Sequence, residues 1–216
     1  MLECLKQKNP TLNLLDVHDN AFSAFGKVID DLDPKEIMAV AADIPMPDAG
    51  ASYVPSEPRF ERLAIAKVIG ERFFGTLPTQ VGYCWGHSNF LNAAEWHASN
   101  EVNIAVTPLV LLLGKRCDMK EGRLSSSAMQ AFYVPAGTVL EVYSTTLHFC
   151  PCEVSANGFG CVVALPAGTN TPLDAAVDDR LLFRKNKWIV AHDQNEALLS
   201  RGVIAGIDGV NYEIQY

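Results

Sequence analysis

The chain has 216 residues, of which 49% are hydrophobic and 19% are charged, and its formal net charge is −8. This is the composition of an ordinary globular protein with enough apolar residues to bury a core. The negative charge argues against nucleic acid and anionic membrane surfaces as partners, because proteins that bind polyanions usually carry a basic face.

The start of the chain, MLECLKQKNPTLNLL, lacks the apolar core of a signal peptide, and the longest apolar stretch, 102–114, is interrupted by polar residues and a proline. We therefore expect a cytoplasmic protein without a membrane segment. The six cysteines form no CxxC pair and lie mostly among apolar neighbours, which predicts reduced, buried thiols rather than a disulfide framework. They are Cys4, Cys84, Cys117, Cys150, Cys152 and Cys161.

The first third of the chain is predicted to be helical or irregular. Apolar residues have helix-like spacing over 18–42, where Asp33 and Pro34 suit the N-cap and first turn of a helix in DPKEIMAVAA. The segment 46–58 is rich in proline and glycine and predicts a loop. Another helix is predicted over about 58–74, where five apolar residues can share one face. These are Leu63, Ile65, Ala66, Ile69 and Phe73.

From about residue 79 the pattern changes to short β-branched and aromatic runs separated by turn sequences. The runs are QVGYCWG, NIAV, LVLLLG, AFYV, TVLEVYSTTLHF and GCVVALP. So many closely spaced strands predict a sandwich or barrel, and no repeat or low-complexity linker divides the chain. We therefore expect one domain over 1–216, with an N-terminal extension (1–78), a barrel core (79–168) and a C-terminal extension (169–216).

The segment EWHASNE, residues 95–101, is the first candidate for a functional site. Glu95, His97 and Glu101 are all odd-numbered, so they would share one face if the backbone stays extended. In a helix, residues 97 and 101 would also share a face, and the strand interpretation therefore depends on the β-rich surroundings. His148, which follows an apolar strand and a pair of threonines, is the second candidate.

Two imidazoles and a carboxylate on one side of a barrel can form a facial triad of metal ligands that leaves positions open for water or substrate. Glu95 is then either a fourth ligand or a base that moves a proton. Oxygen-rich ligation favours Mn, Fe or Ni as the divalent metal ion, with Zn a further option. Glu141 differs in parity from His148, so we expect it to face the other side and its removal to spare the metal. The structural alternative is that the histidines are ordinary hydrogen-bonded residues of a strand.

Other residues near these segments have a structural explanation beside a functional one. His87 either borders the cavity or helps to end a strand. Lys185 and Lys187 either meet an acidic substrate or lie in a solvated loop, which is the commoner case. His18 and His192 belong to no motif. Three aromatic residues either wall a sugar-sized pocket or pack in the strands: Trp85, Trp96 and Tyr143.

The segment around His97 resembles the first motif of the cupin superfamily, G-x5-H-x-H-x3,4-E-x6-G. His97 and Glu101 occupy the positions of the second histidine and the glutamate, and Glu95 stands where the first histidine usually is. Asn89 and Pro108 replace the flanking glycines, so the spacing of the motif is kept better than its residues.

The segment around His148 resembles the second cupin motif, G-x5-P-x-G-x2-H-x3-N. Gly137 is in register and His148 falls on the histidine, while the proline, the inner glycine and the asparagine are replaced. The resemblance covers about residues 80–166 and implies a mainly β protein with a double-stranded β-helix, or jelly-roll barrel, preceded by helices. The replacing residues are Tyr143, Thr145 and Cys152.

Two narrower resemblances concern the function. AFSAFGKVI looks like the opening of the ureidoglycolate lyases, although their glutamine stands where this chain has Glu101. EVNIAVTPLVLLLG, FYVPAGTVLEVYSTTLHFCPC and NKWIVAH look closer to an uncharacterised bacterial cupin-like family.

The expected function is a metal-dependent enzyme that isomerises or epimerises a sugar or hydroxy acid, because a metal site rich in carboxylates suits proton transfer beside a carbonyl. The alternatives are a lyase of the ureidoglycolate type and a non-enzymatic cupin that binds a small ligand. The cupin resemblance also implies a homodimer.

Overall fold

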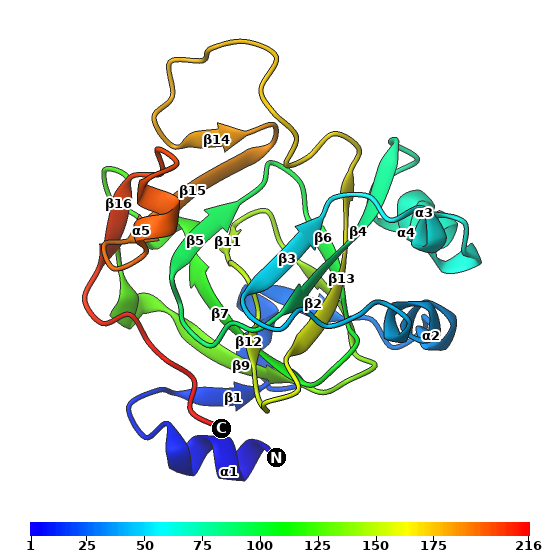
Figure 1. Ribbon diagram of the computed structural model, residues 1–216, viewed down its shortest axis with the longest axis horizontal. Coiled ribbons are helices and arrows are strands. Elements are labelled where there is room, and N and C mark those ends of the chain that lie inside the picture. Colours follow the sequence, from blue (N-terminus) through cyan, green and yellow to red (C-terminus); the bar gives the residue numbers. More distant parts are fainter.

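The computed structural model covers residues 1–216 and consists mainly of β-strands in three sheets, with short helices around them (Figure 1). The helices are α1 (Leu2–Lys8), α2 (Lys35–Ala42), α3 (Pro58–Glu61), α4 (Ala64–Phe73) and α5 (Glu196–Leu199). The strands are β1 (Leu14–Asp16), β2 (Gly26–Val28), β3 (Ala51–Val54), β4 (Thr79–Gly86), β5 (Ala93–Trp96), β6 (Glu101–Ala105), β7 (Leu109–Lys115), β8 (Leu124–Ser125), β9 (Gln130–Val134), β10 (Val139–Val142), β11 (Thr146–Leu147), β12 (Cys152–Glu153), β13 (Phe159–Pro166), β14 (Leu182–Arg184), β15 (Lys187–His192) and β16 (Ala205–Asp208).

Two of the sheets face each other and enclose the core of the barrel. One is antiparallel with six strands in the order β2-β10-β6-β13-β4-β3, and the other has the order β1-β9-β7-β11 with β12 also paired to β7. Leu113 and Phe132 of the second sheet pack against Leu140 and Val163 of the first in one buried cluster. The chain is thus a mainly β protein with a jelly-roll barrel, as its sequence predicts.

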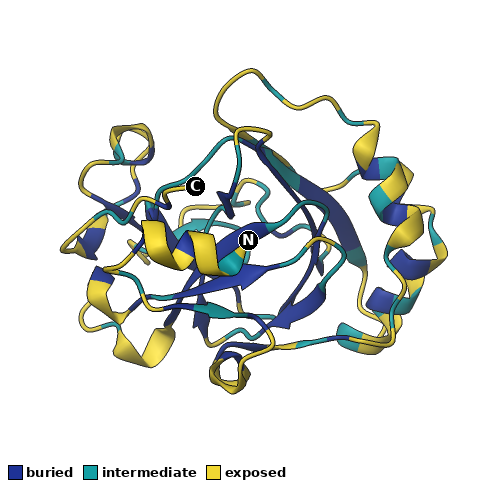
Figure 2. Ribbon diagram, turned by 90° about the horizontal axis from the view of Figure 1, so that it is seen from below, coloured by how far each residue is buried: buried dark blue, intermediate teal, exposed yellow.

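The outer face of the six-stranded sheet is covered by α2, α3 and α4, which lie together at one side of the molecule (Figures 1 and 2). Strand β6 shows how the two faces are divided. Val102 and Ile104 pack in the cluster below the helices, whereas Glu101 and Asn103 line the cavity of the barrel. The period of two along a strand therefore turns polar side chains of β6 into the barrel.

The third sheet packs against the outside of the second. Its order is β14-β15-β16-β8, with β5 also paired to β15. Trp96 of β5, Val190 of β15 and Val110 of β7 belong to one buried cluster, which joins the two sheets. The sheet thereby fixes the position of β5, the strand that leads to His97. None of the helices has the length and apolar character needed to span a bilayer.

The predicted N-terminal elements are confirmed in part. Of the segment 18–42, only α2 is an α-helix, and β2 lies before it. Gly26 explains the strand, because a Cβ there would come within 2.1 Å of the carbonyl oxygen of Glu141 on β10, so glycine lets the two backbones pair closely. The predicted loop 46–58 contains the edge strand β3, which pairs with β4 through its backbone. The helix predicted over 58–74 is present as α3 and α4.

Each of the six apolar runs contains a strand, but TVLEVYSTTLHF is not continuous. A turn at residues 144–145 separates β10 from β11, so the run contributes to both facing sheets. The short strands β1 and β5 are not among the predicted runs. Strand β1 has only three residues and pairs in parallel with β9, so its sequence carries too few residues for a periodic signal.

All six cysteines are free, as predicted, but Cys4 and Cys117 are exposed rather than buried. Burial raises the pKa of the Cys152 and Cys161 thiols, which therefore stay protonated and unreactive. We predict that a thiol reagent at pH 8 labels Cys4 and Cys117 first in the native protein, as read by peptide mass spectrometry. All six should react after unfolding in denaturant, and rapid native labelling of Cys161 would contradict the fold.

Candidate metal centre

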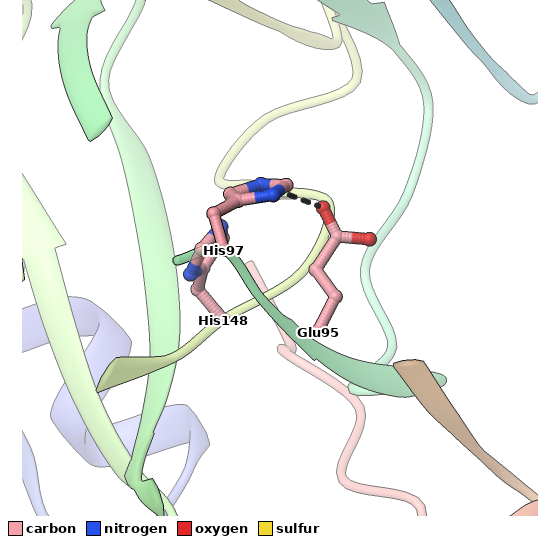
Figure 3. A group of neighbouring side chains, drawn as sticks. All are labelled: Glu95, His97 and His148. Atoms are coloured by element: carbon pink, nitrogen blue, oxygen red, sulfur yellow. Dashed lines mark ion pairs between the residues drawn. The ribbon is translucent and has the colours of Figure 1, made fainter. Parts of the chain in front are cut away.

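The side chains of Glu95, His97 and His148 come together, with their ligand atoms all within 4.8 Å of one another (Figure 3). Glu95 lies in β5, and His148 lies directly after β11. The two face each other in an isolated antiparallel bridge, where the Glu95 amide donates to the His148 carbonyl at 2.6 Å and the His148 amide donates to the Glu95 carbonyl at 3.0 Å. Residues opposed in such a bridge project to the same face, which explains why these two side chains meet.

The backbone between His97 and Glu101 is bent, so neither a continuous extended strand nor a helix brings these two residues together. Strand β5 ends at Trp96, and β6 begins at Glu101. The bend is stabilised by Asn186, whose side-chain oxygen accepts a hydrogen bond from the Ala98 amide at 2.8 Å. The bend returns the chain to the barrel, and Glu101 reaches His97 from the following strand.

The imidazoles of His97 and His148 converge on one carboxylate oxygen. The Nε2 atoms of His97 and His148 lie 3.4 and 3.5 Å from Oε2 of Glu101, and Nε2 of His97 lies 4.0 Å from Oε1 of Glu95. The four side chains are between 1% and 11% exposed. Both Nε2 atoms are buried and without a hydrogen-bond partner, although buried nitrogen atoms in proteins are generally satisfied.

The neighbours of these residues fix which atoms face the centre. Nδ1 of His97 lies 2.6 Å from the carbonyl oxygen of Asn186, and Nδ1 of His148 lies 3.3 Å from that of Thr146. A carbonyl only accepts, so each Nδ1 carries the proton and each neutral ring has its lone pair on Nε2. Asn103 donates to Oε1 of Glu101 at 2.7 Å and leaves Oε2 for the imidazoles. Such outer hydrogen bonds are typical of metal ligands.

Electrostatics also favour a positive charge among these residues. Burial alone would raise the pKa of Glu101, but attraction to His148 and His97 outweighs it and holds that pKa well below the usual range. Burial would likewise lower the pKa of His148, yet the Glu101 carboxylate raises it. The buried carboxylate therefore needs a cation beside it, and either a protonated imidazole or a metal ion can supply that charge.

Glu95 is placed differently from Glu101. One oxygen faces His97, and the other forms an ion pair with Nζ of Lys187, which is only 16% exposed. The prediction of a solvated loop is therefore wrong for Lys187. Lys185 does lie at the surface, where it pairs with the exposed Asp174 at 2.7 Å. Lys187 pairs with one oxygen of Glu95, and the other oxygen stays available to the centre.

The centre opens into a cavity of about 650 Å³. Glu95, Glu101 and His148 line this cavity, while His97 lies behind the wall with a 1% exposed side chain. A volume of this size is within the range of about 300–1,000 Å³ found for small-molecule sites. A divalent ion held at its inner end could thus be reached by a small metabolite.

The remaining sequence candidates divide between cavity and core. His87 lines the cavity and its Nδ1 lies 2.8 Å from a carboxylate oxygen of Glu153, an arrangement that its sequence context alone did not predict. His18 lies at the surface beside Asp16, and His192 bonds a backbone carbonyl. The three aromatic candidates do not line the cavity: Trp85 stacks on Tyr83, Trp96 stacks on Trp188, and Tyr143 lies outside its wall.

Glu141 provides a test of which carboxylates belong to the centre. It is buried outside the cavity lining, where it pairs with Lys27 at 3.1 Å and accepts a hydrogen bond from Asn100 at 2.7 Å. We predict that Glu141→Gln leaves the metal content unchanged and lowers the free energy of unfolding by about 1 kcal/mol, the typical value of a modest ion pair. Metal analysis and denaturant unfolding measure both, and loss of the metal would extend the centre to Glu141.

The fold and these side chains define a class of protein: a jelly-roll barrel with a buried cluster of Glu95, His97 and His148, whose ligand atoms all lie within 4.8 Å of one another and could hold a divalent ion. The chain belongs to the family described as a domain of unknown function, DUF4867, whose profile matches residues 14–212. No curated protein matches the chain.

Among solved structures, the chain is similar to oxalate decarboxylase. A structure of the Bacillus subtilis enzyme at pH 4.6 matches with 9% identity and a TM-score of 0.34 over 58% of this chain and 28% of that chain. A second structure of the same enzyme, from work on its Mn(II) centres, matches with 8% identity and a TM-score of 0.33. It covers 56% of this chain and 28% of that chain. The chain therefore spans little more than a quarter of these enzymes, and its fold is defined by its own strand order.

Proposed function

We propose that the protein is a metal-dependent enzyme that isomerises or epimerises a small sugar or hydroxy acid. The observation that carries the proposal is the pair of buried, unpartnered Nε2 atoms that point at one carboxylate oxygen at the end of a cavity. A structural pair of histidines would normally have its nitrogen atoms hydrogen-bonded. Two lone pairs and a carboxylate oxygen are instead the donors that a divalent metal ion accepts.

The residues present fit such an ion. His97, His148 and Glu101 would hold it through Nε2, Nε2 and Oε2, the atoms that their hydrogen-bond partners leave free. The ion would be Mn, Fe, Ni or Zn, since each binds imidazole together with carboxylate. When bound, it supplies Lewis acidity that polarises a carbonyl or hydroxyl oxygen and makes the adjacent C–H more acidic.

Glu95 is the residue that would move the proton. One of its oxygens pairs with Lys187, and the other lies 4.0 Å from Nε2 of His97. In this role Glu95 removes a proton from the carbon beside the polarised oxygen and, for an isomerisation, returns it to the neighbouring carbon on the same face; an epimerisation requires a second group that delivers a proton to the opposite face. Lys187 orients the carboxylate through their ion pair. Positioned acid–base groups of this kind typically contribute about 10²–10⁴-fold to a rate.

Proton exchange in deuterated water tests this proposal without knowledge of the natural substrate. Purified protein is analysed for bound metal and then incubated with a panel of aldoses, ketoses and hydroxy acids, and deuterium incorporation is followed by NMR. We expect exchange at the carbon next to the carbonyl or hydroxyl for at least one compound, and its loss with EDTA. A metal-free protein, or a panel without any exchange, would overturn the proposal.

The same preparation distinguishes the alternative functions. A lyase of the ureidoglycolate type would release urea from ureidoglycolate, which a coupled assay detects. A binding protein would give a thermal shift with one of the compounds but no deuterium incorporation. Either result would assign the metal centre to a different function.

A further inference from the structure

Two guanidinium groups beside one aromatic ring form a second polar feature of the cavity. Cζ of Arg184 lies 4.4 Å from the ring centroid of Phe183, and Cζ of Arg201 lies 5.4 Å from it. All three residues line the cavity that contains the metal centre. Arg201 is exposed and Arg184 is half-buried, so the pair lies in the part of the cavity nearer to solvent than the buried Glu101.

Neither of these arginines has a carboxylate partner within the protein. Arg72 and Arg123, by contrast, pair with Asp31 and Asp208. The hydrogen bond found for Arg184 goes to the backbone carbonyl of Phe183 at 3.2 Å. Two like charges beside one ring repel each other, and cation–π attraction offsets that only in part. An oxyanion bound between them would remove the repulsion, and guanidinium groups match carboxylate and phosphate geometry.

The charges along the cavity wall favour an anion as well. The lining contains two carboxylates, Glu95 and Glu101, and three fixed cations, Arg184, Lys187 and Arg201, in a chain with a net charge of −8. Lys187 is balanced by Glu95, and a metal ion or a protonated imidazole at the centre would balance Glu101. The two arginines are thus the uncompensated charge of the cavity.

The hairpin of β14 and β15 connects one of these arginines, Arg184, to the metal centre (Figure 1). Its turn residue Asn186, at a φ of 55°, accepts the hydrogen bond from Nδ1 of His97. Arg184 ends the strand before this turn, and Lys187 begins the strand after it. One short hairpin therefore positions a metal ligand, the partner of Glu95 and one of the free guanidinium groups.

We propose that Arg184 and Arg201 bind an oxyanion group of the substrate, a carboxylate or a phosphate, at the end opposite to the one that reaches the metal centre. This inference rests on the proposed function, in which the other end of the substrate reaches the metal centre, and it deepens that function by naming a substrate class. It restricts the substrate class to hydroxy acids or sugar derivatives that carry a second acidic group. Neutral sugars and simple hydroxy acids lack the group that the arginines would bind.

Calorimetry with matched pairs of ligands tests the proposal on the manganese-loaded protein. The pairs are malate against 2-hydroxybutyrate, glucarate against gluconate, and 3-phosphoglycerate against glycerate. At least one acid-bearing member should bind about tenfold more tightly than its counterpart, as expected for charge-assisted hydrogen bonds. Arg184→Gln combined with Arg201→Gln should remove that preference, while Arg180→Gln, an exposed arginine outside the cavity lining, should keep it.

The outcomes separate this inference from the metal centre. Metal content should be the same in the arginine variants and the unchanged protein. If the protein holds no metal, the proposed function fails, and binding of inorganic phosphate to the metal-free protein then tests the arginines alone. Equal affinities within every pair, or a preference that survives the double substitution, would overturn the inference. A preference confined to the phosphate pair or to the dicarboxylates identifies which oxyanion the site accepts.

Discussion

Alanine in place of His97 or His148 is expected to lower the affinity for a divalent metal ion by at least about 100-fold, because losing even an outer hydrogen-bond partner of a metal ligand costs about 10–100-fold. Each substitution removes one of the two Nε2 donors and leaves the buried Glu101 with a single imidazole. The metal content of dialysed protein, measured by inductively coupled plasma mass spectrometry, should fall from near one ion per chain to background in both variants.

Thermal unfolding gives a second readout of the same variants. A ligand that binds only the folded state stabilises it by about 2.7 kcal/mol at a concentration 100 times its Kd. The melting temperature of the unchanged protein should therefore rise with added metal and fall with EDTA, whereas that of both alanine variants should respond to neither. His18→Ala is the matched control, since His18 lies at the surface beside Asp16. Full metal content in His97→Ala and His148→Ala would show that the imidazoles are structural.

The sequence is informative about the centre because the ligands lie in segments with recognisable strand patterns. Parity within β6 places Glu101 on the barrel side, and the same parity rule separates Glu141 from the cavity. The contact between Glu95 and His148 has no such basis. It depends on a backbone bridge between residues 53 positions apart in the chain, and no local periodicity encodes that pairing.

The bend after His97 is a second feature of the centre that the local sequence does not predict. A continuous strand through Ala98 to Asn100 correctly predicts that His97 and Glu101 lie together, but the structure brings them together in another way. The chain turns between them, and Asn186 stabilises that turn. The signal for that contact lies in the C-terminal segment, in a turn residue with positive φ. Lys187 and the arginines belong to the same segment. Its basic sequence, FRKNKW, indicates charge but not that the hairpin directs this charge into the cavity.

Glu95→Gln should separate catalysis from metal binding. If Glu95 moves the proton, the amide lowers the rate of deuterium exchange by about 10²–10⁴-fold, the usual contribution of a positioned acid–base group, and leaves the metal content near that of the unchanged protein. Glu101→Gln is the matched comparison. It removes the charge of the oxygen that lies within 3.5 Å of both imidazoles, so it should lose both metal and exchange.

The Glu95 substitution also leaves Lys187, whose side chain is only 16% exposed, without its partner, which by itself costs stability. Glu95→Gln combined with Lys187→Met removes both charges and so restores charge balance at this position. We expect the double variant to unfold at a higher denaturant concentration than the single variant, to hold the metal, and to remain without exchange activity. Exchange that persists in the folded double variant would assign the proton transfer to another residue. Metal loss in Glu95→Gln equal to that in Glu101→Gln would instead make Glu95 a fourth ligand.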